Sequence, residues 1–302
     1  MENKSSYEVV IVGGSVAGLS AAMTLGRSLR SVLVIDKGEP CNRQTPHSHN
    51  FITQDGVKPH EILAKVKNEL KTYKTIEFAS AYVTDIKKPG SDFLITTEDN
   101  IVYAAKKIIL ATGVKDLLPN IPGFSECWGI SVLHCPYCHG YEVHSKKILL
   151  FANGDIGYEF CKLLSQWSSN LTLLTNGKST LSETQTDYLL EKGYSIVEKE
   201  IQSFSHKTGN LESVVFTDGS LLAGDAIFAR VPNTIQTPLI LGLGVQLKED
   251  GLIQVDDFGK TNVTGVYAAG DNTTMMRSVA NAAAQGNRAG AFLNKELIEE
   301  NF

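Results

Sequence analysis

Two cysteines, Cys135 and Cys138, stand two residues apart in the run CPYCH of this 302-residue chain. A pair at this spacing can pass two electrons by alternating between dithiol and disulfide. Pro136 fits the first turn of a helix, where its missing N–H costs nothing and where a cysteine thiolate is favoured. His139 follows directly, and with an ordinary pKa of about 6.5 it can take or return a thiol proton. The run predicts a catalytic centre of Cys135, Cys138 and His139.

Three other interpretations of the pair stay open. A zinc site would need more ligands, and His134 is too close in sequence to His139 for both to converge on one ion with the thiolates. A glutaredoxin also uses the letters CPYC, but there the motif follows the first strand of a small domain. Reduced cysteines can also be simply buried, which is our expectation for Cys41, Cys127 and Cys161. We expect no metal.

Composition and charge restrict the partners and the cellular compartment of such a redox centre. The net charge of -5 has no basic run behind it, which argues against nucleic acid or a membrane surface as a partner. No apolar run reaches about 18 residues and the first residues lack a secretory signal, so we expect a cytoplasmic protein. In that reducing compartment five cysteines are poor material for a structural disulfide framework. Small molecules or proteins remain as partners.

The N-terminal residues carry a nucleotide-binding pattern. A buried strand, a helix and a second strand are predicted in order over residues 7–12, 17–29 and 31–35. The first turn reads GGSVAG, from Gly13 to Gly18, where glycines let backbone N–H groups and a helix N-terminus approach a pyrophosphate. Ser15 replaces one glycine, and Asp36 stands where the fingerprint needs an acid for a ribose hydroxyl. The pattern predicts a dinucleotide site without deciding between NAD and FAD.

A second, weaker copy of this pattern follows the cysteines. Its strand, helix and strand are predicted over residues 147–152, 158–167 and 170–175. The turn reads ANGDIG, from Ala152 to Gly157, so the first glycine of the fingerprint is missing. The run from Thr175 to Lys178 offers neither a carboxylate for a ribose nor an arginine for a 2′-phosphate. We expect a scaffold that has lost efficient nicotinamide binding.

The rest of the chain supplies connecting elements. Helices are predicted over residues 60–73 and 279–297, and strands within 76–84 and over 93–97, 107–111 and 265–269. The stretches 116–124 and 232–238 are rich in proline or turn residues and are typical of linkers.

Taken in order, these motifs resemble the low-molecular-weight thioredoxin reductase family over nearly the whole chain. The matching motifs are GGSVAG at Gly13, HNF at His49, ATG at Ala111, the central CxxC, PNT at Pro232 and GVYAAGD at Gly265. The resemblance implies an α/β fold with two Rossmann-like domains of the three-layer ββα type. The FAD-binding domain would be discontinuous, with residues 116–236 inserted as the redox-active domain between 1–115 and 237–302.

The resemblance also implies roles for individual residues. Cys138 would face the flavin, Cys135 would exchange with the substrate, and His139 would stand where the family carries an acidic proton donor. The implied FAD contacts are Gly13, Gly14, Ser15, Ala17, Gly18, Asp36, Lys37, Gln44, Asn50, Thr112, Gly113, Gly270, Asp271, Arg277, Ser278 and Val279. A homodimer is expected from the family alone.

Two departures from the family pattern indicate a subgroup. The nicotinamide motif is degraded, and the cysteines continue as CHGYE, from Cys138 to Glu142. This form is similar to flavoproteins that oxidise small dithiols, such as the gliotoxin-type thiol oxidases, in which oxygen can accept the electrons. The loss of NADPH features is also similar to ferredoxin-dependent flavin thioredoxin reductases.

Our leading hypothesis is therefore an FAD-dependent thiol/disulfide oxidoreductase, without efficient NADPH use, that acts on a small dithiol or disulfide. One alternative is a reductase of thioredoxin or a similar protein, supplied with electrons by ferredoxin or by NADPH. A third hypothesis, from a different class, is a non-catalytic flavin-bound redox sensor. Direction is set by potentials and partners rather than by the motif.

Overall fold

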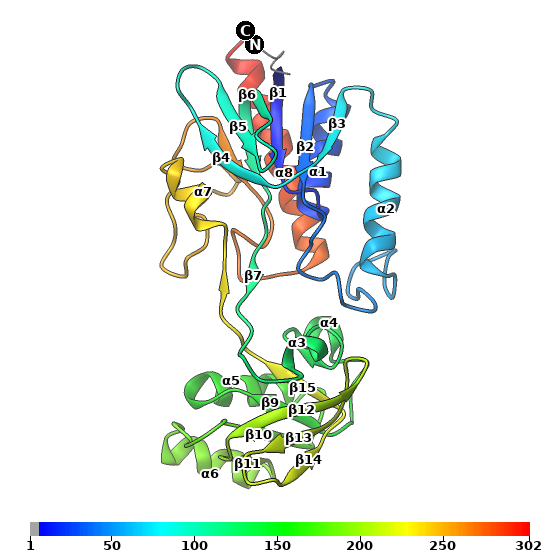
Figure 1. Cartoon of the computed structure of the whole chain (residues 1–302), viewed down its shortest axis with the longest axis vertical. Coiled ribbons are helices and arrows are strands. Elements are labelled where there is room, and N and C mark those ends of the chain that lie inside the picture. The colour runs from blue at the N-terminus through cyan, green and yellow to red at the C-terminus, as the bar shows by residue number, and fades with distance from the viewer. Residues whose placement is uncertain (1–5) are drawn as a thin grey trace. The chain divides into compact units, whose positions relative to one another are not determined.

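A computed structural model describes residues 6–302, which divide into two compact units (Figure 1). Unit 1 takes in the described residues up to Arg43 together with Asn50–Lys115 and Asn233–Phe302. Unit 2 takes in Gln44–His49 and Asp116–Pro232. Unit 1 is thus discontinuous in sequence, and the central part of the chain forms unit 2.

Unit 1 is built on a sheet that, within residues 6–302, has seven strands. The order is β3-β2-β1-β6-β5-β4, with β17 paired to β6. Strands β1, β2, β3, β6 and β17 run parallel, and the β4–β5 hairpin extends the sheet in antiparallel fashion. The strands are β1 Ser6–Val12, β2 Val32–Asp36, β3 Ile76–Ser80, β4 Val83–Lys87, β5 Phe93–Thr97, β6 Val102–Leu110 and β17 Val266–Ala268.

Helices cover one face of this sheet, as Figure 1 shows. They are α1 Val16–Arg27, α2 Pro59–Leu70 and α8 Val279–Glu299. A Cβ added at Gly286 would lie 2.0 Å from the carbonyl oxygen of Ala17, so α8 and α1 approach closely because this glycine has no side chain. The residues of the other face form one core with apolar side chains of β4 and β5, of α7 Thr237–Gly242 and of the segment that follows α7.

A buried ion cluster ties α8 to the strands. Glu296 accepts hydrogen bonds from Lys107 Nζ at 2.6 Å, Lys260 Nζ at 2.7 Å and the Tyr267 hydroxyl at 2.9 Å. Glu300 also pairs with Lys107, whose side chain is only 5% exposed. Burial alone would raise the pKa of Glu296, but these donors outweigh it and hold the pKa at about 2. The Glu296 carboxylate is therefore a stabilising charge wherever it is ionised.

Replacing Glu296 by glutamine is expected to destabilise unit 1 by about 3 kcal/mol, because it leaves the Lys107 ammonium buried without its main counter-charge. Because the folded pKa lies below the ordinary value of 4.5, the Glu296 contribution is present above about pH 4.5 and is lost as pH falls toward about 2. Urea unfolding at neutral pH and at pH 3 measures both effects. Lys295→Gln removes the exposed Lys295–Glu299 pair and serves as the control. An equal loss of unfolding free energy in this variant would contradict a specific role for the cluster.

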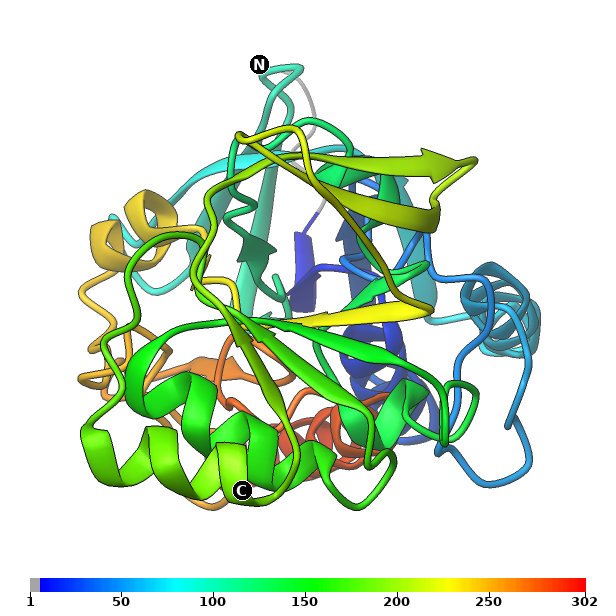
Figure 2. The ribbon, with the colours of Figure 1, turned by 90° about the horizontal axis from the view of Figure 1, so that it is seen from below.

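Unit 2 has three layers. Among the described residues its main sheet has five parallel strands in the order β11-β10-β9-β15-β8. These are β8 Val132–Leu133, β9 Ile148–Phe151, β10 Leu171–Leu174, β11 Ser195–Val197 and β15 Ala226–Ala229. Helices α5 Gly154–Leu164 and α6 Glu183–Glu191 lie side by side on one face (Figure 2).

The other face of that sheet is covered by an antiparallel sheet of β12 Ile201–Lys207, β13 Asn210–Phe216 and β14 Leu221–Ala223. Phe204, Val214 and Phe216 of this layer pack against Leu149 and Ile227 of the main sheet. Two short helices, α3 Phe124–Cys127 and α4 Pro136–His139, complete the unit. The arrangement confirms the α/β class and the three-layer ββα type expected from sequence.

The two connections between the units pair with each other as β7 Lys115–Asp116 and β16 Asn233–Thr234. The return crossing lies at Pro232–Asn233, four residues before the expected boundary of 236/237. The reason is local: Ile235 is buried in the core of unit 1, and the Gln236 side chain donates to the Val83 carbonyl at 2.7 Å. The chain therefore enters unit 1 at the start of β16.

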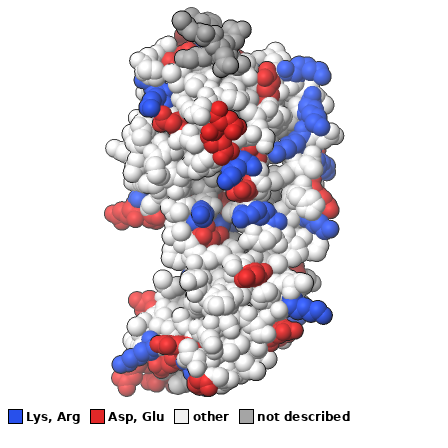
Figure 3. Space-filling view, viewed as in Figure 1, with Lys and Arg blue, Asp and Glu red and all other residues white. Residues whose placement is uncertain are grey.

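The surface carries charges of both signs. Lys and Arg side chains are interspersed with Asp and Glu over the face drawn in Figure 3, in keeping with the net charge of -5. Along residues 6–302, no helix combines the length and the apolar character needed to cross a bilayer.

Candidate active site

The redox centre lies in unit 2, on the short helix α4. Cys135 and Cys138 form a disulfide with their Cα atoms 5.3 Å apart. Cys135 is the N-cap and Pro136 the first helical residue, as the sequence predicted. The backbone N–H groups of Cys138 and His139 both donate to the Cys135 carbonyl, at 3.2 and 3.1 Å. One helical turn therefore holds both sulfurs at bonding distance, and His139 follows them as the last residue of α4.

His139 is held in its neutral form. Loss of hydration around this partly buried ring lowers its pKa to about 4, while the Glu142 carboxylate raises it in part and His49 lowers it further. His49 Nε2 lies 3.6 Å from Glu142 Oε1, so the segment Gln44–His49 of unit 2 brings a second imidazole to this group. Near neutrality the uncharged His139 ring can therefore accept a proton from a thiol, but it is not protonated and cannot act as the acid.

The glycine turn of unit 1 follows β1 and is tightly wound. Gly13 has a φ of +108°, and a Cβ there would lie 2.2 Å from the carbonyl oxygen of Ala111. A Cβ at Gly18 would lie 1.9 Å from the Gly13 carbonyl oxygen, so both positions require glycine. Ser15 is the N-cap of α1, and in the described part of the chain its hydroxyl makes no capping bond. The start of α1 is thus open to a phosphate.

The acid at the end of β2, Asp36, lies under the same turn. A Cβ at Gly14 would lie 2.7 Å from the Cβ of Asp36, so the backbone of the turn passes directly over this carboxylate. Lys67 of α2 lies 3.6 Å from Asp36 Oδ2. Lys37 instead points to Glu39 at 3.5 Å and lies over the Tyr82 ring. Asp36 thus lies at the edge of the glycine turn, as the sequence predicted.

Two further turns end neighbouring parallel strands, β6 and β17, at the same edge of the sheet. Thr112 Oγ1 accepts from Asn272 Nδ2 at 3.2 Å, and Gly113 has a φ of +62°. Gly270 has a φ of +97°, and a Cβ there would lie 3.0 Å from Ala17 Cβ. The structure therefore brings the turns after β1, β6 and β17 together.

The segment between β17 and α8 adds charged and capping groups. Arg277 Nε lies 3.4 Å from Asp271 Oδ2, and Cys41 Sγ lies 3.8 Å from the same carboxylate oxygen. Ser278 caps α8 by accepting from the Asn281 N–H at 3.1 Å, and Val279 is the first helical residue.

Gln44 and Asn50 differ from the rest of the set. Gln44 belongs to unit 2, where its Cγ would lie 3.1 Å from a Cβ on Gly129, so the described contacts do not join it to the glycine turn. Asn50 belongs to unit 1 and adopts a φ of +60°, with its backbone N–H donating to Asp55 Oδ1 at 2.7 Å.

In the second nucleotide-binding pattern, the Asn153 side chain occupies the N-terminus of α5. Asn153 is the N-cap, and its Oδ1 accepts from the Gly154 N–H at 2.8 Å and from the Thr180 N–H at 2.9 Å. Its Nδ2 donates to the Lys178 carbonyl at 3.0 Å. A Cβ at Gly154 would lie 2.7 Å from the Thr180 hydroxyl, so the loop after β10 closes directly over this helix end.

Comparison with known proteins decides the family. The model of the pyridine nucleotide-disulphide oxidoreductase family matches residues 7–286. The chain belongs to this family. Thioredoxin reductase tcpT of Claviceps purpurea is 30% identical over 311 residues, which cover 99% of this chain and 97% of that protein. Within the family the chain is thioredoxin-reductase-like, a flavin-dependent oxidoreductase that acts on sulfur groups.

Solved structures agree with this assignment. A putative thioredoxin reductase TrxB from Bacillus anthracis superposes with a TM-score of 0.94 at 33% identity, over 98% of this chain and 100% of that one. HlmI superposes with a TM-score of 0.93 at 30% identity, over 100% of this chain and 95% of that one. The two Rossmann-like domains expected from sequence are thereby confirmed.

The dinucleotide cradle of this oxidoreductase fits the family's flavin cofactor. The positions at which a Cβ would strike backbone, Gly13 and Gly18, clear the approach to the α1 N-terminus, and the Asp36 carboxylate lies against the same turn, where it would meet a ribose. When bound, a flavin accepts or delivers an electron pair.

Sequence reasoning missed several residues at these sites. Asn153 was noted only as part of a broken glycine motif, although asparagine is a preferred N-cap and could have been read as the group that satisfies α5. The His49–Glu142 pair joins segments far apart in sequence, and Lys67 was part of a predicted helix with no assigned role. Only long-range packing reveals these partners.

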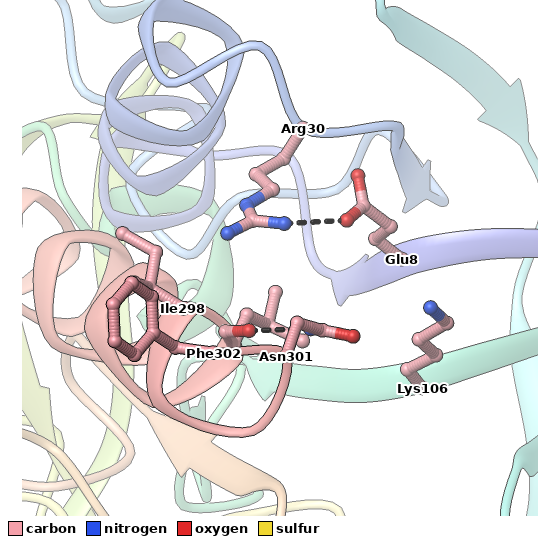
Figure 4. A pocket seen from close by; sticks show the side chains of 7 residues that line it. Glu8, Arg30, Lys106, Ile298, Asn301 and Phe302 are labelled. Atoms are coloured by element: carbon pink, nitrogen blue, oxygen red, sulfur yellow. Dashed lines mark hydrogen bonds and ion pairs between the residues drawn. The ribbon is translucent and has the colours of Figure 1, made fainter.

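An open pocket of about 440 Å³ in unit 1 is lined by Glu8, Arg30, Lys106, Leu297, Ile298, Asn301 and Phe302 (Figure 4). The Arg30 guanidinium is already used there, because it donates to Glu8 Oε1 and to Asn294 Oδ1, both at 2.7 Å. The pocket lies beside the start of β1, whereas the glycine turn follows the end of that strand. We assign it no ligand.

Proposed function

We propose that this oxidoreductase uses FAD to pass electron pairs between Cys135/Cys138 and a small dithiol or disulfide, with little use of NADPH. Asp36 and the glycine turn would hold the adenosine diphosphate part of FAD, and the turns after β6 and β17 would border the remainder. The single observation that carries the NADPH part is the position of Asn153 at the start of α5.

The Asn153 carboxamide occupies the place at which a Rossmann domain receives a pyrophosphate. A dinucleotide at this helix would have to displace its hydrogen bonds to Gly154 and Thr180 and also lift the loop that contains Lys178. Nearby, Asp155 accepts from Gln185 Nε2 at 2.7 Å, which fixes the α6 start beside that of α5. The loss of glycine at Ala152 and the tight N-cap both support a site closed to NADPH.

Oxidation of a dithiol by this centre balances as follows. One substrate thiolate attacks Cys135, the Cys135–Cys138 bond breaks, and Cys138 leaves as a thiolate. The second substrate thiol attacks the mixed disulfide and releases Cys135, so the substrate leaves as a disulfide. Of the two thiol protons, one ends on Cys135 and the other on His139, while Cys138 holds the electron pair that the flavin receives. Reduction of a disulfide reverses each step.

A second candidate function is the reduction of thioredoxin or a similar protein disulfide. The names of the relatives support it, since tcpT and the Bacillus anthracis protein are both called thioredoxin reductases. If NADPH is excluded at α5, the electrons for this reaction would have to come from another donor, such as reduced ferredoxin.

The decisive experiment is an anaerobic titration of the purified yellow protein, followed by the flavin absorbance. Small dithiols are expected to bleach the flavin stoichiometrically, whereas micromolar NADPH and NADH are not. Rapid, stoichiometric bleaching by micromolar NADPH would refute the closed site. Bleaching by reduced ferredoxin alone would favour the reductase, and slow bleaching by every donor would favour a redox sensor. With oxygen admitted, a dithiol oxidase should form peroxide.

A further inference from the structure

Tyr137, in the spacer between the redox cysteines, carries an exposed aromatic ring. The residue is 65% exposed, although Pro136 beside it is buried. An exposed tyrosine within α4 adds little to folding, because most of its ring gains nothing from burial. The exposed face of the ring is therefore available to contact a molecule outside unit 2.

The ring is nevertheless held in place from one side. Trp167 meets it edge-on, with ring centroids 5.5 Å apart and planes at 88°. The Trp167 backbone is fixed on both sides, since its N–H donates to Leu164 at 2.9 Å and its carbonyl accepts from Ser145 at 2.8 Å. The indole also lies against the backbone of Gly140, where a Cβ would be 2.6 Å from Nε1. Tyr137 is thus a pre-oriented ring with a free surface.

The segment that carries this ring has few charged side chains. The segment 134–145 contains one carboxylate, Glu142, and no lysine or arginine. Glu142 is partnered by His49 at 3.6 Å, and His139 is neutral because its pKa is lowered to about 4. Tyr141, which is 77% exposed and stacked on His144, adds a second exposed ring one turn after Tyr137. This surface suits a neutral, planar group better than an ionic one.

We propose that Tyr137 contacts the substrate and selects dithiols and disulfides whose sulfur is attached to an uncharged planar ring. A mixed disulfide brings the carbon next to the substrate sulfur to about 4 Å from the Cys135 Cβ. A ring on that carbon therefore comes within reach of the residue two positions further on. The proposal rests on the proposed function in taking Cys135 as the cysteine that exchanges with substrate.

The test uses the half-reaction of the holoenzyme, which needs no physiological electron donor. The enzyme is reduced anaerobically with dithionite, desalted, and mixed with dipyridyl disulfide or with hydroxyethyl disulfide, both neutral. Cys135 attacks one sulfur and one thiol leaves; Cys138 then closes the Cys135–Cys138 disulfide and releases the second thiol. The enzyme dithiol supplies both electrons and both protons. Acid quenching, alkylation and mass spectrometry measure the rate with either probe.

Tyr137→Ala is expected to slow the reaction with dipyridyl disulfide about fivefold and that with hydroxyethyl disulfide less than about twofold. Comparing each variant with the wild type for one probe removes the probe's intrinsic reactivity. Tyr137→Phe keeps the ring and should keep the wild-type rates. The matched control is Tyr188→Ala, which removes an exposed tyrosine of α6 and should change neither rate.

An equal slowing with both probes would overturn the proposal, because it would mean that the ring serves the cysteines rather than the substrate. Unchanged rates with both probes would overturn it as well. A separate measurement tests the proposed function: it identifies the cysteine that carries the mixed disulfide. If Cys138→Ser traps no adduct on Cys135 while Cys135→Ser traps one on Cys138, the roles given to the two cysteines are wrong, whatever Tyr137 does.

Discussion

Cys138→Ser should abolish bleaching of the bound flavin by small dithiols, lowering its rate by about three orders of magnitude or more. The Cys135–Cys138 disulfide is the only one among residues 6–302, so with serine at 138 a dithiol has no described disulfide to open. Serine keeps the size of the side chain and the start of α4, so the fold should be retained. Anaerobic stopped-flow absorbance of the flavin measures the rate directly.

The control for this substitution is Cys161→Ala. Cys161 is a free, buried thiol whose pKa is raised by burial to about 12, so it takes no part in exchange. Its replacement should leave dithiol-driven bleaching unchanged. If Cys138→Ser bleached as fast as Cys161→Ala, the electrons would reach the flavin without the disulfide, and the proposed mechanism would fall.

Loss of the His139 imidazole should lower dithiol-driven bleaching about 100-fold in His139→Ala, because a thiol proton then has no positioned acceptor. The pH profile gives the sharper readout. Since the pKa of His139 is lowered to about 4, the wild-type ring stays neutral down to that region, so acidification through about pH 6.5 should lower the wild-type rate no more steeply than that of His139→Ala, the shared fall coming from protonation of the substrate thiolate.

Opening of the disulfide changes this balance in a testable way. The Cys138 thiolate is a new negative charge beside His139 and should raise the pKa of the ring once the enzyme is reduced. Proton uptake on anaerobic reduction, followed with a pH indicator near pH 7, should therefore be larger in the wild type than in His139→Ala. Equal uptake by both proteins would show that the proton goes elsewhere.

Much of the fold could be predicted because it depends on local patterns. The predicted strand 7–12 and the C-terminal helix 279–297 correspond to β1 Ser6–Val12 and α8 Val279–Glu299. Residues 201–223 escaped prediction because β12, β13 and β14 are partly exposed, and their pairing with one another carries no nucleotide-binding motif. Helix α7 was not predicted; it begins at the end of the expected linker 232–238, with Pro238 in its first turn.

The residues of the candidate sites also fall into two groups, those defined by local sequence and those defined by long-range contacts. The glycine turn and the CxxC helix are defined by neighbours in sequence, so residue type and spacing were enough to place them. The closure of α5 depends on Asn153 meeting Thr180, which is 27 residues away, and the neutral state of His139 depends on its surroundings. A motif can say that a glycine is missing, but only the packed loop shows what has taken its place.

The division of unit 1 into separate stretches also sets an order for synthesis. Residues 116–232, nearly all of unit 2, leave the ribosome before β17 and α8 have been translated. Until then the face of the unit 1 sheet that α8 covers remains bare, and the Lys107 ammonium lacks Glu296. We therefore expect the nascent chain to fold from its middle outward, with the nucleotide cradle closing last and a chaperone most needed until α8 has been translated.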